Sequence, residues 1–297
     1  MNKEMPYPLA SYPELIINVC ITGMIPTKDM TEFVPVSPEE IAEDAVRCYD
    51  EGASIVHLHA RGEDGKPTWK ASIYEDIITR IRRERPDMIC CISTSGRNWP
   101  EFERRSEALY LQGDGKPDMA SLTLGSLNFP TGPSVNTIEM VSRLAQAMQD
   151  NGIKPELEVF DPGMINLGKI LESKGIITGK KYWNLLFGSI NSIPADVNSI
   201  NYLTSLLPDN SVWAIAGIGQ FQLPMNAASL IMGGNVRVGL EDNIFYDYEK
   251  KQLATNVDLV KRLKRIAEEI YRPVASAKNV RKLLEIKQRE YASPELG

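Results

Sequence analysis

The sequence predicts an α/β protein in which eight parallel strands, separated by helices, close into a (β/α)₈ TIM barrel. Two observations lead to this prediction. Short apolar runs alternate with longer amphipathic segments along the whole chain, as in a parallel sheet covered by helices. No low-complexity linker divides the 297 residues, and one closed barrel fits this length better than two doubly wound halves. We therefore expect residues 1–297 to form a single barrel domain.

Eight apolar runs have the length and composition of buried strands. They are residues 16–22, 54–60, 88–93, 119–124, 156–160, 182–187, 212–218 and 236–240. Amphipathic segments with helical spacing lie between or after them. These are residues 37–50, 73–83, 134–149, 195–206, 225–232 and 256–271. The first has the clearest start, because Ser37 is a capping residue, Pro38 suits the first turn, and Glu40 completes a capping box.

The composition is that of a globular protein without nucleic acid or membrane as its main partner. The formal net charge is −6, whereas a phosphate-binding surface normally carries a basic excess. No run of about 18 apolar residues is present, and residues 1–12 lack the apolar core of a secretory signal. The four cysteines show no zinc-ribbon or redox spacing, so we expect buried, reduced thiols in a cytoplasmic protein. Residues 274–297 are charged, and we expect a C-terminal helical extension that packs on another subunit.

Both histidines of the chain lie in one predicted strand, in the run IVHLHAR. Alternate side chains of a strand point to the same side, so His57 and His59 point together while Val56 and Leu58 face the helices. The strand ends at a loop, which places the pair at the carboxyl end of the barrel, where barrel enzymes hold their sites. Two imidazoles form half of a site for zinc or another divalent metal. The alternative is a pair of hydrogen-bonded structural histidines.

A catalytic zinc usually takes three protein ligands, and Glu241 at the end of the last strand is the best third candidate. Arg237 lies four residues earlier and shares its face of the strand with Glu241 and Gly239, which leaves room in the barrel mouth. Asp242 follows directly. An arginine beside a carboxylate lowers its pKa and orients it, so Asp242 is a candidate base with Arg237 as its partner. Taken alone, Glu241 and Asp242 would be interpreted as solvent-exposed residues of a loop that follows a strand.

Other polar residues follow predicted strands and collect at the same rim. A single residue of this kind is usually a cap or a turn, but several at one rim favour contact with a substrate. The candidates for substrate binding are Ser93, Thr123, Ser126, Asn128 and Glu158. A Gly217-Ile218-Gly219 run ends the penultimate strand, and its backbone N–H groups are a weak candidate for phosphate binding.

Several blocks of the chain resemble the β-keto acid cleavage enzymes. They are GASIVHLHAR (52–61), GKPT (65–68), PDMASLT (117–123), PELEVFD (155–161), LPMN (223–226) and MGGNVRVGLEDN (232–243). The resemblance runs from about residue 16 to residue 243. It implies a (β/α)₈ barrel, a homotetramer, and one divalent metal, typically zinc.

The resemblance also implies roles for individual residues. The metal ligands would be His57, His59 and Glu241, and the base would be Asp242 with Arg237 as its partner. Ser93, Thr123 and Glu158 match positions near the substrate. The reaction implied is condensation of a β-keto acid, through its enolate, with acetyl-CoA. Transfer of CoA and retro-Claisen cleavage then release acetoacetate and a new acyl-CoA. The sequence does not indicate which residues bind CoA.

The chain departs from the family pattern at a position that bears on the substrate. A lysine-fermenting member carries an acid after the run Ile21-Thr22-Gly23, and this acid holds the amino group of its substrate. Ile25 stands there in this chain, and an apolar side chain does not pair with an ammonium. We therefore expect a keto acid without an amino group. Relatives also carry histidine at Asn235, an arginine near Gln220, and aspartate at Gly62.

Two other classes of function compete with this interpretation. A zinc-dependent hydrolase of a small carbonyl substrate would use the metal to activate water, but such barrels often need further histidines, and this chain has none left. A ligand-binding barrel with a structural metal is the second, although structural zinc sites are usually closed by cysteines.

Overall fold

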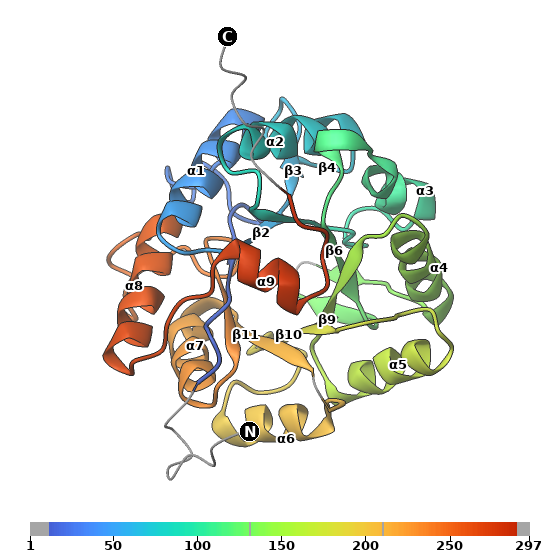
Figure 1. Ribbon diagram of the computed structural model, residues 1–297. Coiled ribbons are helices and arrows are strands. Elements are labelled where there is room, and N and C mark those ends of the chain that lie inside the picture. The colour runs from blue at the N-terminus through green and yellow to red at the C-terminus, as the bar shows by residue number, and fades with distance from the viewer. Residues whose placement is uncertain (1–11, 131, 210, 290–297) are drawn as a thin grey trace.

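A closed barrel of eight strands forms the centre of the molecule (Figure 1). The computed structural model describes residues 12–289 apart from residues 131 and 210. Around the barrel the strand order is β1-β12-β11-β10-β9-β6-β5-β2, and every neighbouring pair is parallel. The strands are β1 (Ile17–Cys20), β2 (Ile55–Leu58), β5 (Ile89–Ile92), β6 (Met119–Thr123), β9 (Lys154–Val159), β10 (Tyr182–Phe187), β11 (Val212–Gly217) and β12 (Asn235–Val238). Each overlaps one of the eight predicted runs, so the predicted (β/α)₈ barrel is confirmed.

Helices surround the barrel (Figure 1). They are α1 (Pro38–Asp50), α2 (Ala71–Glu84), α3 (Phe102–Ser106), α4 (Ile138–Asp150), α5 (Pro162–Ser173), α6 (Val197–Leu206), α7 (Gln222–Ile231) and α8 (Asn256–Glu269). The capping box before α1 is formed, since Ser37 Oγ accepts from Glu40 N and Glu40 Oε2 accepts from Ser37 N, each at 3.1 Å. Within the described residues, no helix is long and apolar enough to cross a membrane.

The sequence did not predict α3 or α5. Helix α5 contains Gly163 and Gly168, which weaken its helical signal. The structure explains Gly168, because a Cβ there would lie 2.5 Å from Trp183 Cη2, so α5 packs closely on β10.

Two short antiparallel pairs lie outside the barrel and correct two predicted boundaries. Strand β3 (Ala60–Arg61) pairs with β4 (Pro67–Thr68), so β2 ends at Leu58 and His59 lies just beyond it. Strand β7 (Leu127–Phe129) pairs with β8 (Gly132–Ser134), so Ser134 is not in α4, which begins after its cap Thr137.

The outward side chains of the strands pack against the helices in one large apolar core, to which Val56 and Leu58 belong as predicted. The four cysteines are buried and free of disulfides.

A ninth helix, α9 (Ala277–Leu283), lies across the amino end of the barrel, toward the viewer in Figure 1. Its Val280, together with Ala275, Leu284 and Ile286, forms an apolar cluster with inward side chains at the strand starts, Ile55 among them. A helix is therefore present in this segment, as expected, and its packing on another subunit stays a prediction. One side of α9 is buried against its own barrel, whereas Leu283 of the same helix is exposed. Residues 290–297 lie outside the described part.

A buried ion-pair network holds α9 to the barrel. Asp118, just before β6, accepts hydrogen bonds from Arg281 of α9 at 2.9 and 3.0 Å and from Arg82 of α2 at 3.0 Å. Burial alone would raise the pKa of Asp118, but Arg82 and Arg281 outweigh burial and hold the pKa below its usual 3.8. Asp118 is therefore ionised at neutral pH.

Replacing Asp118 by asparagine should destabilise the fold. The Asp118→Asn variant leaves two buried arginines without their counter-charge, and we expect a loss of about 3–5 kcal/mol in the free energy of unfolding at pH 7. Because the folded pKa is depressed, this difference is present above the unfolded pKa and disappears as the pH falls through the lower folded value. Urea titrations at several pH values measure it. The matched control is Asp114→Asn, whose carboxylate is exposed, and equal midpoints for the two variants would contradict the prediction.

Candidate active site and metal centre

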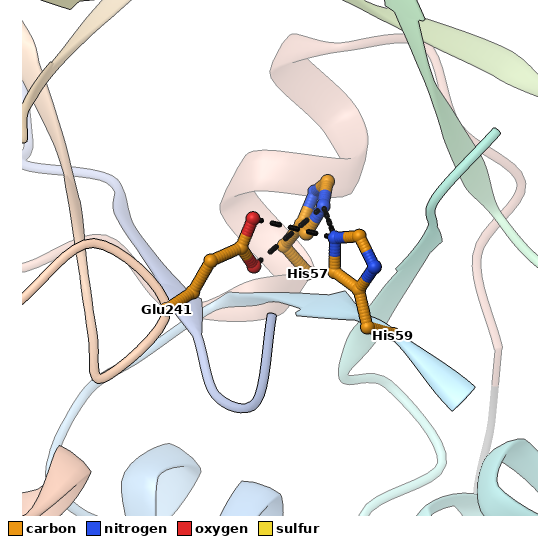
Figure 2. A group of neighbouring side chains, drawn as sticks. All are labelled: His57, His59 and Glu241. Atoms are coloured by element: carbon orange, nitrogen blue, oxygen red, sulfur yellow. Dashed lines mark hydrogen bonds and ion pairs between the residues drawn. The ribbon is translucent and has the colours of Figure 1, made fainter. Parts of the chain in front are cut away.

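Three side chains from opposite ends of the sequence converge at the carboxyl end of the barrel (Figure 2). His57 is in β2, His59 follows β2, and Glu241 lies beyond the end of β12. His57 Nε2 and His59 Nε2 are 3.4 Å apart, and His59 Nε2 is 3.3 Å from Glu241 Oε1. His57 Nε2 lies 4.0 Å from Glu241 Oε2. The two histidines and the acid that the sequence suggested as ligands are therefore brought together.

The spacing of these atoms fits a single divalent cation. In a tetrahedral zinc site with bonds of about 2.0–2.1 Å, neighbouring ligand atoms are about 3.3–3.4 Å apart, which matches two of the three separations. Glu241 Oε2 is buried and has no hydrogen-bond partner among the described residues. A buried carboxylate oxygen without a partner is costly, and a cation at this position would satisfy it.

The loop after β1 packs closely on Glu241. Gly23 has a positive φ of 65°, and a Cβ at this residue would lie 2.5 Å from Glu241 Cγ. Arg61 holds the loop in place, since its Nη2 donates to Gly23 O at 2.7 Å and to Pro26 O at 2.9 Å. The position of Glu241 thus depends on a glycine and on an arginine that does not line the cavity.

Beneath the three candidate ligands, Glu156 holds the other ring nitrogen of His57. Glu156 Oε2 is 2.7 Å from His57 Nδ1, and its Oε1 accepts from Asn18 Nδ2 at 2.6 Å and from Asn184 Nδ2 at 3.3 Å. Burial alone would raise the pKa of Glu156, but His57 lowers it below its usual value, so the group is a carboxylate. His57 must therefore donate from Nδ1, which leaves Nε2 free for a metal. This role of Glu156 was not expected from the sequence, although strand alternation points Glu156 and Glu158 to the same side.

A second group, His57, Cys91 and Glu156, is also close enough to hold an ion. Burial and the Glu156 charge raise the pKa of the Cys91 thiol well above 9.0. The thiol instead donates to Glu156 Oε2 at 3.4 Å, and a protonated thiol is a poor ligand. The first group is thus the better metal centre.

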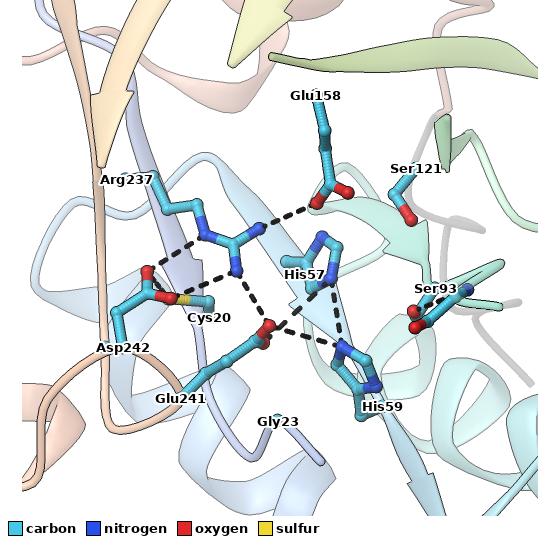
Figure 3. Close-up of polar contacts among 12 residues, drawn as sticks. Cys20, Gly23, His57, His59, Ser93, Ser121, Glu158, Arg237, Glu241 and Asp242 are labelled. Carbon is cyan, nitrogen blue, oxygen red and sulfur yellow. Dashed lines mark hydrogen bonds and ion pairs between the residues drawn. The ribbon is translucent and has the colours of Figure 1, made fainter. Parts of the chain in front are cut away.

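Arg237 is the hub of the polar contacts in Figure 3. Its Nε donates to Asp242 Oδ2 at 3.0 Å and its Nη2 to Asp242 Oδ1 at 3.3 Å. The same Nη2 donates to Glu241 Oε1 at 2.7 Å, and Nη1 donates to Glu158 Oε1 at 3.3 Å. Cys20 Sγ adds a hydrogen bond to Asp242 Oδ2 at 3.1 Å. The expected contact between Arg237 and Asp242 is present, and both of the acid's oxygens are held.

The charges act differently on the two glutamates. Burial alone would raise the pKa of Glu241, but Arg237, His59 and His57 hold this pKa well below its usual value. Burial raises the pKa of Glu158, and Arg237 offsets this rise only in part. Glu241 is therefore a permanent carboxylate, whereas Glu158 takes up a proton more readily.

Gly239 has a different role from the one that the sequence suggested. Its φ is 158°, and a Cβ would lie 2.0 Å from Cys20 O. The glycine lets the backbone turn against β1 and does not open the barrel mouth. The suggested phosphate site nearby is not supported either, because Gly219 N donates to Asp242 O at 2.7 Å and Ile218 N to Phe187 O at 3.0 Å.

A cavity of about 520 Å³ opens beside these residues. Of the residues expected to bind substrate, Ser93, Thr123 and Glu158 line it, and Thr123 Oγ1 donates to Glu158 Oε2 at 2.7 Å. Ser126 and Asn128 do not line it. Ser126 Oγ accepts from Asn136 N at 2.8 Å, and Asn128 is exposed on β7. Both belong to the β7–β8 hairpin region, whose fold the strand-end pattern did not reveal. Arg97 also lines the cavity, and the sequence pattern gave no sign of it.

The fold and the cluster of ligands define a barrel enzyme with a candidate metal centre at the carboxyl ends of its strands. The model of the beta-keto acid cleavage enzyme family matches residues 14–286, and the chain belongs to this family.

Known proteins resemble the chain over most of its length. It is 36% identical over 274 residues to a 3-keto-5-aminohexanoate cleavage enzyme of Acetoanaerobium sticklandii, covering 92% of this chain and 98% of the relative. It is 38% identical over 274 residues to a 3-oxoadipate:acetyl-CoA acetyltransferase of Cupriavidus necator, covering 91% and 94%. A solved ternary complex of ObcA with a C4-CoA adduct and oxalate has a TM-score of 0.74 at 19% identity. It covers 85% of this chain and 67% of that chain, so it supports the fold.

Replacing Glu156 by glutamine should weaken metal binding without removing a ligand. The Glu156→Gln variant loses the carboxylate that accepts from His57 Nδ1, and we expect the dissociation constant for Zn²⁺ to rise about 10- to 100-fold. Titration against a chromogenic chelator measures it. The matched control is Glu158→Gln on the same strand, which does not contact a histidine and should change the constant much less. An unchanged constant in Glu156→Gln would refute the assigned role.

Proposed function

We propose that this chain is a zinc-dependent β-keto acid cleavage enzyme that uses acetyl-CoA. It would condense a β-keto acid with the acetyl thioester and then release acetoacetate and a new acyl-CoA. The observation that carries the proposal is the convergence of His57, His59 and Glu241 on one point beside Asp242, whose two oxygens are held by Arg237. The names of relatives that act with acetyl-CoA on keto acids support it.

The metal site and the base divide the chemistry between them. When bound, a divalent cation at His57, His59 and Glu241 would polarise the keto acid's carbonyl oxygen and offset the negative charge that develops there. Asp242 would take the proton from the carbon between the carbonyl and the carboxylate. Arg237 fixes the direction of this carboxylate, and the Cys20 thiol occupies a further lone pair of Oδ2. Ser93, Thr123 and Glu158 are the polar groups of the cavity that would contact the substrate.

The carbon skeleton then rearranges with no other reagent than acetyl-CoA. The carbanion left by deprotonation would attack the thioester carbonyl, and CoA would leave as the thiolate. The thiolate would add to the keto acid's original ketone, and the bond between that carbon and the deprotonated carbon would break. Acetoacetate leaves after it regains a proton, and the rest of the keto acid becomes the new acyl-CoA. A zinc-dependent hydrolase is the weaker alternative, because the family match and the named relatives favour cleavage and transfer.

Two further properties belong to the proposal. We propose a homotetramer, which the family resemblance supports, and light scattering on the purified protein tests it. A cytoplasmic location is supported by four buried cysteines that form no disulfide.

Purified protein should contain about one zinc per chain. We expect the His57→Ala variant to lose it, because a site with two remaining ligands binds zinc weakly. Elemental analysis measures the content, and Cys48→Ala, at a buried cysteine outside the site, should retain the metal. Zinc at full occupancy in His57→Ala would place the ion elsewhere.

Replacing Asp242 by asparagine should stop the reaction at its first proton transfer. We expect acetoacetate formation from a β-keto acid and acetyl-CoA to fall about 10²- to 10⁴-fold. In the absence of acetyl-CoA, NMR can measure the rate at which the substrate's α-hydrogens exchange with deuterated water. This rate should also fall in Asp242→Asn. The control is Asp161→Asn, which caps α5 at the same rim, because asparagine caps helices equally well. Hydrolysis of acetyl-CoA without keto acid would favour a hydrolase.

A further inference from the structure

The loop after β5 brings a second cation, Arg97, into the cavity. Its guanidinium lies over the ring of Phe129, with 3.6 Å between Cζ and the ring centroid. Its Nε is buried without a hydrogen-bond partner, and the guanidinium forms no ion pair with any residue of the described ranges. The Arg97 side chain is partly buried, and a charge that is removed in part from water normally has a partner. Arg97 is therefore available to pair with an anion that enters the cavity.

The acids of the cavity are already engaged elsewhere. Glu158, Glu241 and Asp242 all contact Arg237, and Glu241 also faces the histidines. None of the three forms an ion pair with Arg97. Burial lowers the pKa of Arg97, while Glu241 and Glu158 act on it in the opposite direction. Arginine remains charged when it is partly buried. Among the described residues that line the cavity, Arg97 is thus a positive group without an ion-pair partner, and each acid is already paired.

Part of the wall of this cavity is apolar. The side chains that line it include Ile25, Leu127, Phe129, Phe160, Leu186 and Ile190. Such a wall suits the methylene chain of a substrate. An ammonium group would find no unpaired carboxylate among the described lining residues. A carboxylate would find the planar donors of Arg97, which already lie against Phe129.

We propose that Arg97 selects β-keto acids that carry a second carboxylate at the far end of the chain. This inference rests on the proposed function and names its substrate class. The reacting end of the acid would lie at His57, His59 and Glu241, and the far carboxylate would pair with Arg97. Arg97 is thus a specificity-determining residue that contacts substrate but takes no part in bond making. The phosphates of CoA offer the same anionic chemistry and are distinguished by the test.

The test compares two keto acids of equal length that differ only at the far end, 3-oxohexanedioate and 3-oxohexanoate. We expect the unmodified enzyme to have the higher kcat/KM for the diacid. In Arg97→Met the preference should fall about 10- to 100-fold, chiefly through KM for the diacid, which is the usual effect of a lost hydrogen bond to a charged group. Arg97→Lys should recover part of it. The control Arg104→Met removes an arginine that lies over Trp69, outside this cavity, and should keep the preference.

Three results would overturn the assignment. A preference that is the same in Arg97→Met as in the unmodified enzyme would remove Arg97 from recognition. A rise in KM for acetyl-CoA, with the preference unchanged, would assign the anion to a CoA phosphate. An unmodified enzyme that prefers the monoacid would exclude the diacid class.

Binding without turnover separates this inference from the proposed function. Calorimetry with hexanedioate and hexanoate needs no reaction, and hexanedioate should bind the enzyme more tightly in an Arg97-dependent way. If neither keto acid is consumed but this difference is seen, the proposed reaction fails and the anion site remains. If turnover is seen and the binding difference is missing, the anion site fails alone.

Discussion

The site depends on one buried cation and the three carboxylates around it. Arg237 is 2% exposed, and removing a guanidinium from water costs several kcal/mol unless its charge is matched. Glu158 supplies one contact from β9, and Glu241 and Asp242 supply the others from the turn after β12. Burial alone would lower the pKa of Arg237, but Asp242 and Glu241 raise it well above its usual range, so the charge persists. Without Arg237, three acids would face one another at the barrel mouth, and their repulsion would disfavour the ionised forms that a ligand and a base require.

Below this hub a second set of polar side chains continues into the barrel. His57 links the two sets, because one of its nitrogens faces Glu241 and the other contacts Glu156. Glu156 is in turn held by Asn18 and Asn184. A barrel interior is usually filled by branched apolar side chains. Here the middle of the barrel is polar, and the apolar contribution comes from the helical shell and from the cluster under α9.

The same electrostatics bear on the substrate. Among the described residues, Arg237 contacts each acid that lines the cavity, so none of these carboxylates is left for a positively charged substrate group, while Arg97 has no ion-pair partner. Ile25, on the loop after β1, adds an apolar side chain to the same wall. The pairing of Arg237 with these acids thus favours a negatively charged substrate group over a positively charged one, in line with the role proposed for Arg97.

The sequence by itself determined the barrel, the eight strand positions, and the convergence of His57, His59 and Glu241. Side chains alternate along a strand, and the carboxyl ends of parallel strands meet at one end of a barrel. The positions of these residues in the sequence were therefore enough to predict that they converge. The spacing of Arg237 and Asp242, and the family resemblance after it, suggested Asp242 as a base and Arg237 as its partner. Only the tertiary structure showed that Glu156 contacts His57 and that Arg97 lies over Phe129. It also showed that α9 covers the amino end of its own barrel and that Ser126 and Asn128 lie away from the cavity. Each of these depends on how loops and side chains from distant segments pack, and such contacts leave no period in the sequence.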